Sequence, residues 1–436
     1  MPIKLFLFIK RKCVIILNIG ELKNMGKRFL NTKTKEVYLE ENMGNKCNEI
    51  LNKYLPYQKV LIVTSEQFKK ENLNYYNEFL KSLKTANLEY VFESKISINK
   101  HSTANLLKKV DEDIACIIAV GNGALIELIK IVAYIKEIPY IIVPVKQFEP
   151  QFFTTVAKMK VDGIMKFYRV NSPLAVLVEK ELLLKQKRAD IIYTFSRIMS
   201  VSMQLLDEFL IGICKQQTLP SKHYSALKNI LYDTLSLKNE LYNYSESAIV
   251  TLINNGLKMG LILQSYNLYN IDAARLSTTA SFKLDSNHKI PFFYYQMIES
   301  LFLVELYESF ILNLKLNNFF TANVKERLKI SGSLFSEKLV KTNIIKNMEN
   351  CELLKLNCYQ LKEYETEILK EIRGTKELLK EAYTMLKRMN LAFSYYVEKA
   401  LDIDTVKKSI CLAPDLSCTD NFLKIMFQFG VLDYQF

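Results

Sequence analysis

A glycine turn between an apolar run and a helical segment is the first feature of this sequence with the chemistry to hold a ligand. Gly121, Asn122 and Gly123 follow the β-branched run 114–120, and helical periodicity extends over 124–135. A turn from strand to helix presents backbone N–H groups and the positive end of the helix dipole, which together bind phosphate. Glycine permits close approach and positive φ, and asparagine is the next most tolerant residue. A tight turn that holds no ligand explains these three residues equally well.

Residues that bind metals are few. The chain has three histidines, His101, His223 and His288, and eight cysteines, none of which forms the close pairs of a zinc knuckle or redox motif. We interpret the cysteines as reduced thiols and expect a cytoplasmic protein.

The composition is that of a globular protein with two or three domains. Of the 436 residues, 49% are hydrophobic and 24% charged. The net charge of +13 fits a nucleic acid, a membrane surface or an anionic ligand. Because the lysines are dispersed and no nucleic-acid motif is present, we expect no nucleic-acid partner. A basic scaffold on a lipid or nucleic-acid surface is the weakest hypothesis, since it depends on charge alone.

The N-terminal residues contain two apolar runs, 5–9 and 13–17, and each is too short to span a bilayer. We therefore expect no transmembrane segment. Met25 is a reasonable alternative start, so we interpret residues 1–34 as an extension outside the fold, and whether residues 1–24 are translated stays open.

Strands and helices alternate over residues 35–180. Apolar strands are expected from Lys59, within 89–98, over 114–120 and over 140–143, and the last ends at Pro144. This alternation predicts a parallel, Rossmann-like sheet with helices on both faces, an α/β nucleotide-binding domain.

Residues 181–436 are expected to form an all-α domain, because their apolar residues recur at intervals of three and four. Such stripes usually mark core packing. The expected connection is 216–221, and the expected helices cover 192–210, 247–263, 294–314 and 361–389.

The glycine turn also carries a resemblance. AVGNGALIELIK resembles the GxGGGTxxDxxK segment of the dehydroquinate synthase and iron-containing alcohol dehydrogenase superfamily. Gly121, Gly123 and Lys130 match it, whereas Glu127, Asn122 and Ala119 replace its Asp, middle Gly and first Gly.

Downstream segments resemble sn-glycerol-1-phosphate dehydrogenases in particular. IPYIIVPVKQFEPQFFTTVAKMKVDGIMKFY is similar to IPxISVPTxxSxDGxxSxxA followed by DGxKxxY, and SPLAVLVEKELL to PxAIxxDxxxL. With the closing helices, the similarity covers about residues 35–433. It implies a dehydroquinate synthase-like fold and interconversion of dihydroxyacetone phosphate and sn-glycerol 1-phosphate with NAD or NADP.

The resemblance also assigns cofactor positions. It places the pyrophosphate on Gly121, Asn122 and Gly123, with Glu127 nearby. Val145 stands where the family has a Thr that contacts the nucleotide, Phe148 where it has a Ser, and Pro150 where it has a substrate-side Asp. Lys160 and Lys166 are candidates for a substrate phosphate on charge alone.

The family's metal ligands have no counterparts. The resemblance implies zinc held by one Asp and two His, but these positions fall on Ser196, Phe282 and Phe292 or its neighbour Phe293. Asp190 comes too early to serve and is interpreted as a surface or capping residue, and His288 is a weak candidate. The metal polarises the substrate hydroxyl, and one alternative hydrogen-bond donor contributes only about 3–4 kcal/mol.

One favoured hypothesis and two alternatives follow. The favoured one is a divergent glycerol-1-phosphate dehydrogenase-like protein with its metal site lost and its catalysis degenerate. The alternatives are an active zinc- and NAD(P)-dependent dehydrogenase, or a noncatalytic subunit that binds a nucleotide, a polyol phosphate or a partner. The sequence leaves open the choice between NAD and NADP, the true substrate and a homo-oligomeric state.

Overall fold

The computed structural model describes twelve segments of the chain, which form two compact units. Unit 1 comprises the described residues of Met1–Val161, Met165–Ile191 and Ile249–Asn267, and unit 2 comprises those of the remaining ranges. The described residues are 33–93, 96–161, 164–216, 221–266, 273–285, 290–315, 324–335, 340–345, 359–389, 401–416, 421–429 and 431–432.

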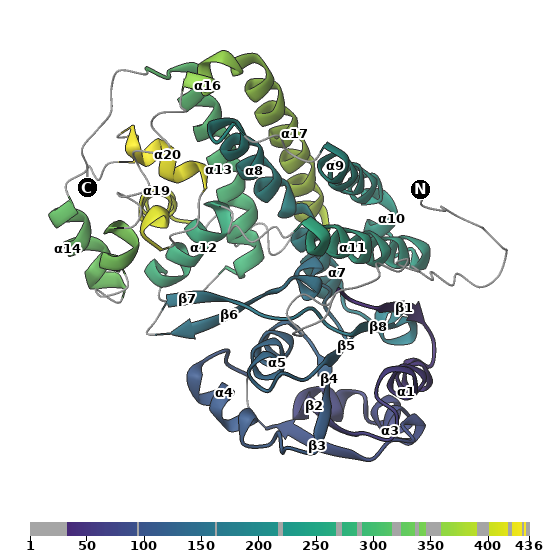
Figure 1. The fold of residues 1–436 in the computed structure, drawn as a ribbon. Helices are drawn as coiled ribbons and strands as arrows, with labels where there is room; N and C mark the ends of the chain where they lie inside the picture. Colours follow the sequence, from purple (N-terminus) through teal and green to yellow (C-terminus); the bar gives the residue numbers. More distant parts are fainter. Residues whose placement is uncertain are drawn as a thin grey trace. The chain divides into compact units, whose positions relative to one another are not determined.

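Unit 1 is built on a six-stranded sheet in which every neighbouring pair is parallel (Figure 1). The strand order is β1-β8-β5-β4-β2-β3. The strands are β1 (Glu36–Glu40), β2 (Lys59–Ser65), β3 (Asn87–Phe92), β4 (Ile114–Gly121), β5 (Tyr140–Pro144) and β8 (Ala175–Glu179). The parallel sheet followed by a helical region was predicted from the sequence and is confirmed.

Both faces of the sheet are covered, because its central strands are apolar at successive positions. Ile62, Ile118 and Ile141 belong to a buried cluster that includes residues of α1 and α3. Alternate residues such as Ile117 and Ile142 are also fully buried and point to the opposite face. The helices of this unit are α1 (Met43–Tyr54), α2 (Glu66–Glu71), α3 (Leu73–Ser82), α4 (Lys100–Leu107), α5 (Gly123–Ile135), α6 (Lys180–Leu184) and most of α11 (Glu246–Tyr266).

The strand order places a switch point between β2 and β4. From β2 the chain moves outward to β3, and from β4 it moves the other way to β5. Ligands of open α/β sheets bind outside the carboxyl ends of the strands at such a point. Here Gly121 at the end of β4 lies level with Pro144 at the end of β5.

Helix α11 lies close to the short 3-10 helix η1 (Pro150–Phe153). A Cβ on Gly260 would lie 2.3 Å from Cδ2 of Phe153 and 2.7 Å from the carbonyl oxygen of Pro150. The side chain of Gln264 donates a hydrogen bond of 2.9 Å to the carbonyl oxygen of Phe153. These contacts fix the segment that follows β5.

Unit 2 is helical in its described residues. The buried stripe of α17 (Glu365–Met389), which includes Ile368, Leu379 and Leu386, packs against α13 (Phe292–Leu312). The other helices are α7 (Arg188–Met199), whose first turn belongs to unit 1, α8 (Val201–Cys214), α9 (Ser221–Ser236), α10 (Lys238–Tyr242), α12 (Ala273–Leu284), α14 (Val324–Leu334), α16 (Tyr359–Glu363), α19 (Ile403–Leu412), η2 (Ala413–Leu416) and α20 (Phe422–Gln428).

Some boundaries differ from those predicted. The expected helix 192–210 is two helices, α7 and α8, with a break at Ser200, and α16 ends before α17 begins. Two strands, β6 (Val156–Val161) and β7 (Ile164–Arg169), form a separate two-stranded sheet that was not predicted, because neither has the continuous apolar run that marks the strands of the main sheet. Of the expected connection 216–221, residues 217–220 lie outside the described residues. No helix among the described residues is long and apolar enough to cross a membrane.

Candidate functional site

The predicted glycine turn lies at the carboxyl end of β4. Gly121 ends the strand, Asn122 is extended, and α5 begins at Gly123. The carbonyl oxygen of Asn122 accepts the N–H groups of Leu125 at 2.9 Å and Ile126 at 3.2 Å. A Cβ on Gly121 would lie 2.4 Å from Cδ2 of Leu125, so a larger residue there would force the Leu125 side chain to shift.

The side chain of Asn122 joins the turn to the segment after β5 rather than capping α5. Its Oδ1 accepts the backbone N–H groups of Val145 at 3.3 Å and Lys146 at 3.1 Å. These two backbone N–H groups therefore already have a hydrogen-bond acceptor within the protein.

A carboxylate lies against the first residue of α5. The Oε1 atom of Glu149 is 3.1 Å from the position that a Cβ of Gly123 would take, and Glu149 is only 5% exposed. The positive end of a helix dipole stabilises a negative charge there.

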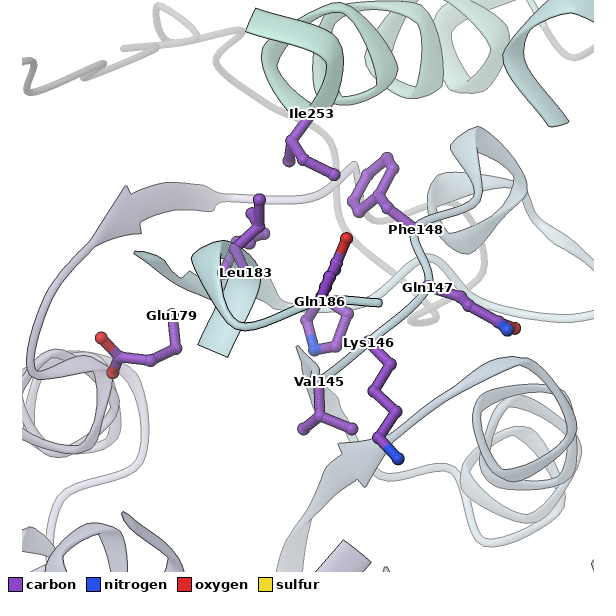
Figure 2. A pocket seen from close by; sticks show the side chains of 10 residues that line it. Val145, Lys146, Gln147, Phe148, Glu179, Leu183, Gln186 and Ile253 are labelled. Atoms are coloured by element: carbon purple, nitrogen blue, oxygen red, sulfur yellow. The ribbon is translucent and has the colours of Figure 1, made fainter. Parts of the chain in front are cut away.

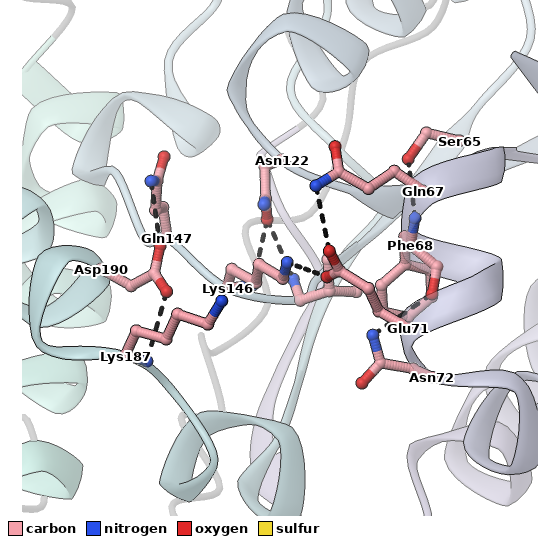
Figure 3. A network of polar contacts seen from close by, with 11 residues as sticks. Ser65, Gln67, Phe68, Glu71, Asn72, Asn122, Lys146, Gln147, Lys187 and Asp190 are labelled. Atoms are coloured by element: carbon pink, nitrogen blue, oxygen red, sulfur yellow. Dashed lines mark hydrogen bonds and ion pairs between the residues drawn. The ribbon is translucent and has the colours of Figure 1, made fainter. Parts of the chain in front are cut away.

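An ion pair extends across the end of β4 (Figure 3). Lys146, which follows β5, pairs with Glu71 at the end of α2, the helix that follows β2. Since β4 lies between β5 and β2, the pair crosses in front of the glycine turn. Gln67 donates to Glu71 Oε1 at 3.0 Å, and the hydrogen bonds from Lys146 and then Gln67 lower the pKa of Glu71.

A second set of polar contacts holds the segment after β5, at the first turn of α7. Gln147 donates to Asp190 Oδ1 at 3.0 Å, and Asp190 Oδ2 accepts the backbone N–H of Lys187 at 3.3 Å. Asp190 therefore has the capping role that the sequence predicted, but it is buried at 9% exposed rather than a surface residue.

A small hollow lies at the ends of β5 and β8 (Figure 2). It encloses about 210 Å³, open solvent included. Val145 and Phe148, two predicted cofactor positions, line it and are nearly fully buried. Glu179 also lines it, and burial raises the pKa of this carboxyl although it accepts the N–H of Met43 at 3.0 Å. Even with open solvent included, this volume is below the roughly 300–1,000 Å³ of typical ligand pockets.

Glu127, another predicted cofactor position, is buried and bonded within unit 1. Its Oε2 accepts the backbone N–H of Lys158 on β6 at 2.7 Å. Its neighbour Lys130 is fully buried and donates to the carbonyl oxygens of Gln151 at 2.7 Å and Val156 at 3.2 Å. In this structure both residues of the family-like pattern hold η1 and β6 against α5.

The three predicted metal positions carry no ligand set. The Ser196 hydroxyl donates to the carbonyl oxygen of Ile192 in its own helix at 2.7 Å. The rings of Phe282 on α12 and Phe292 on α13 are in contact, with centroids 5.2 Å apart, and the Phe282 ring also contacts Tyr295 at 5.7 Å. The neighbouring Phe293 contacts Tyr193 at 5.7 Å.

These residues do not fit a divalent metal, because a phenyl ring has no lone pair to coordinate zinc. Within the segments that the structure describes, no group of three or more His, Cys, Asp or Glu residues could hold a metal ion. His288 lies outside the described residues. His101 is exposed and bonded to Asn105, and His223 is half-buried.

Sequence reasoning missed the charged residues of the sheet edge, Glu149, Lys146 and Glu71. The sequence held a signal for two of them, since Lys146 and Glu149 are charged residues in the short segment that follows the buried strand β5. Of the candidates for a substrate phosphate, Lys160 lies on β6, whereas the side chain of Lys166 is outside what the structure describes.

Comparisons with known proteins agree with this architecture. Residues 38–185 match the model of the iron-containing alcohol dehydrogenase family. No curated protein matches the chain in sequence.

Solved structures share the fold. An archaeal halo-thermophilic alcohol dehydrogenase from a Red Sea brine pool has a TM-score of 0.58 at 12% identity, covering 94% of this chain and 100% of its own. A putative alcohol dehydrogenase from Ralstonia eutropha has a TM-score of 0.57 at 10% identity, covering 94% and 98%. Glycerol dehydrogenase from Schizosaccharomyces pombe has a TM-score of 0.53 at 11% identity, covering 83% and 93%. The chain therefore has the dehydroquinate synthase-like fold of these dehydrogenases, and its residues 38–185 carry the sequence pattern of the iron-containing alcohol dehydrogenase family.

Proposed function

We propose that this protein is a divergent relative of the glycerol-1-phosphate dehydrogenases that keeps the dehydrogenase scaffold and no longer performs metal-dependent hydride transfer. The observation that carries the proposal is the ring contact of Phe282 and Phe292, the two positions that the resemblance assigns to metal-binding histidines. Apolar contact between α12 and α13 takes the place of coordination there.

The chemistry explains why this change is decisive. A hydride leaves an alcohol carbon only as the hydroxyl oxygen takes up negative charge, and in this family a metal supplies the compensating charge. The Ser196 hydroxyl, the third family position, is bonded to its own helix and is no substitute.

The retained role under this proposal is binding. By the resemblance, the ligand is a nucleotide such as NAD or NADP, or a phosphorylated polyol, at the carboxyl edge of the sheet. Under this proposal the protein acts as a noncatalytic subunit, either with a partner protein or in a homo-oligomer. The support is the strand, turn and helix at Gly121 to Gly123, which lie at the switch point.

Metal content and turnover of the full-length protein test the proposal. We expect far less than one zinc per chain by elemental analysis, and no oxidation of NADH or NADPH with dihydroxyacetone phosphate. Stoichiometric zinc together with turnover would contradict it and establish the active-enzyme alternative.

A gain-of-ligand variant tests whether the two rings mark the lost metal position. The double variant Phe282→His, Phe292→His is expected to bind zinc at least about tenfold more tightly than the natural protein, measured by competition with a chromogenic chelator. The matched control is Tyr90→His, Phe92→His, which replaces another half-buried aromatic pair whose centroids are 4.8 Å apart. Equal zinc affinity in both double variants would show that Phe282 and Phe292 do not mark that position.

A further inference from the structure

At the carboxyl end of β4, the N-terminus of α5 is the place where a bound anion would lie. The chain's own charged and polar groups surround this place. In open α/β sheets a phosphate lies at a helix N-terminus outside the carboxyl ends of the strands. Here the carboxylate of Glu149 lies against Gly123, the first residue of α5, at a contact distance of 3.1 Å from its Cβ position. Glu149 is only 5% exposed, so its carboxylate points into the protein and not into solvent.

A phosphate at the N-terminus of α5 would compete with the Glu149 carboxylate for the same position. A phosphate is an anion, as is the carboxylate of Glu149 when ionised, and the same helix dipole stabilises either charge. A phosphate group placed at Gly123 would contact a buried carboxylate of like charge, where the low dielectric makes the repulsion strong. The ligand would therefore have to displace Glu149.

The neighbouring donors are also taken. A phosphate between the glycine turn and the segment after β5 would need the backbone N–H groups of Val145 and Lys146, which donate to Asn122 Oδ1. The ammonium group of Lys146 is paired with Glu71 across the end of β4 (Figure 3). Asn122 stands where the resemblance has a glycine, and a glycine would leave both N–H groups available.

We propose that Glu149 is an intramolecular substitute for a phosphate at the N-terminus of α5, and that it competes with dinucleotides and free pyrophosphate for this position and so weakens their binding. The proposal rests on the retained sheet edge of the proposed function, but not on the state of the metal positions. Under it, the edge is a self-occupied anion site, and a nucleotide enters only when Glu149 leaves.

Removal of the carboxylate is the direct test. Inorganic pyrophosphate and NADH are titrated into the full-length natural protein and the Glu149→Ala variant by calorimetry at one fixed salt concentration. Glu149→Ala is expected to bind both at least about tenfold more tightly than the natural protein. Adding Lys146→Met to Glu149→Ala should reverse part of this gain, because Lys146, whose backbone N–H bonds to Asn122 of the glycine turn, contributes a positive charge to this end of the sheet.

Two controls separate the proposal from simpler explanations. Glu112→Ala removes the same charge from an exposed residue that precedes β4, at the opposite end of the strand, and should leave pyrophosphate affinity unchanged. Because Glu149 is buried, circular dichroism and a thermal melt must first show that Glu149→Ala is folded. If it is not, Glu149→Gln, which keeps the size and removes the charge, replaces it, with an expected gain of at least about threefold.

Equal pyrophosphate affinity in the natural protein and a folded Glu149 variant would overturn the inference, whether both bind tightly or neither binds. That outcome would leave the proposed loss of catalysis in place if the protein also lacks zinc. Conversely, stoichiometric zinc and turnover with another electron donor, combined with tighter pyrophosphate binding by Glu149→Ala, would overturn only the proposed function.

Discussion

Glu299 on α13 is a fully buried carboxyl whose surroundings are hydroxyl groups. Thr278 Oγ1 donates to its Oε2 at 2.7 Å, and the Ser281 hydroxyl donates to its Oε1. Burial raises the pKa of Glu299 to about 8, and the hydroxyl hydrogen bonds reduce that effect without cancelling it. At neutral pH this side chain is therefore largely a neutral acid, which explains why it can be buried among hydroxyl groups.

From the raised pKa of Glu299 we predict how the free energy of unfolding changes with pH. The folded protein retains a proton that the unfolded chain releases above its ordinary pKa of 4.5, so the free energy of unfolding falls as pH rises from about 5 to 8. In Glu299→Gln this contribution, at most about 1.4 kcal/mol per pH unit, is absent and the profile is flatter. Urea denaturation at several pH values checks this, with the exposed Glu78→Gln as control. Parallel profiles for the natural protein and Glu299→Gln would refute the assignment.

At the scale of elements, buried polar pairs join helices that are distant in the sequence. Asp207 on α8 accepts the N–H of Ala273, the first residue of α12, at 2.7 Å and the hydroxyl of Tyr307 on α13 at 2.8 Å. Arg327 on α14 donates from Nε to Asp415 on η2 at 2.9 Å, and both side chains are only 2% exposed. Burial of these groups is tolerated because each meets a partner.

The packing of α11 on η1 gives a prediction at this scale. Gly260→Ala should lower the free energy of unfolding by about 1–3 kcal/mol, because the new methyl group overlaps Phe153 and the Pro150 carbonyl. The matched control is Gly374→Ala on α17, where a Cβ would meet nothing within 4 Å. That change should stabilise the protein by about 0.5–1 kcal/mol through helix propensity. Denaturant titration of both variants checks the prediction, and stabilisation by both would contradict the close approach at Gly260.

For the whole molecule, the net charge of +13 is the dominant long-range feature. Like charges repel in the compact state, and salt screens them, shortening the Debye length from about 30 Å at 0.01 M to about 8 Å at 0.15 M. We expect the melting temperature to rise by about 2–4 °C over this range, corresponding to roughly 1 kcal/mol. A fall instead would mean that exposed ion pairs such as Lys185 with Glu181 outweigh the net repulsion. Differential scanning calorimetry at two salt concentrations distinguishes the two results.

The sequence by itself determined the class of the fold. The runs around Ile118 and Ile141 are long enough and apolar enough that only central parallel strands bury both of their faces, and the helical periodicity of 361–389 needs no tertiary information. The glycine turn could also be located from the sequence, because glycine marks a change of backbone direction. The strands β6 and β7 escaped prediction because each has six residues interrupted by lysine or arginine and lacks a continuous apolar run.

Only the tertiary structure decided what the site residues meet. No local pattern reveals that Glu149 reaches Gly123, that Lys146 reaches Glu71 across β4, or that two phenylalanines from different helices share a contact. These partners are set by strand order and helix packing, which bring together residues separated by tens of positions. Periodicity constrains which face a side chain occupies, but the identity of its neighbour depends on how distant elements pack.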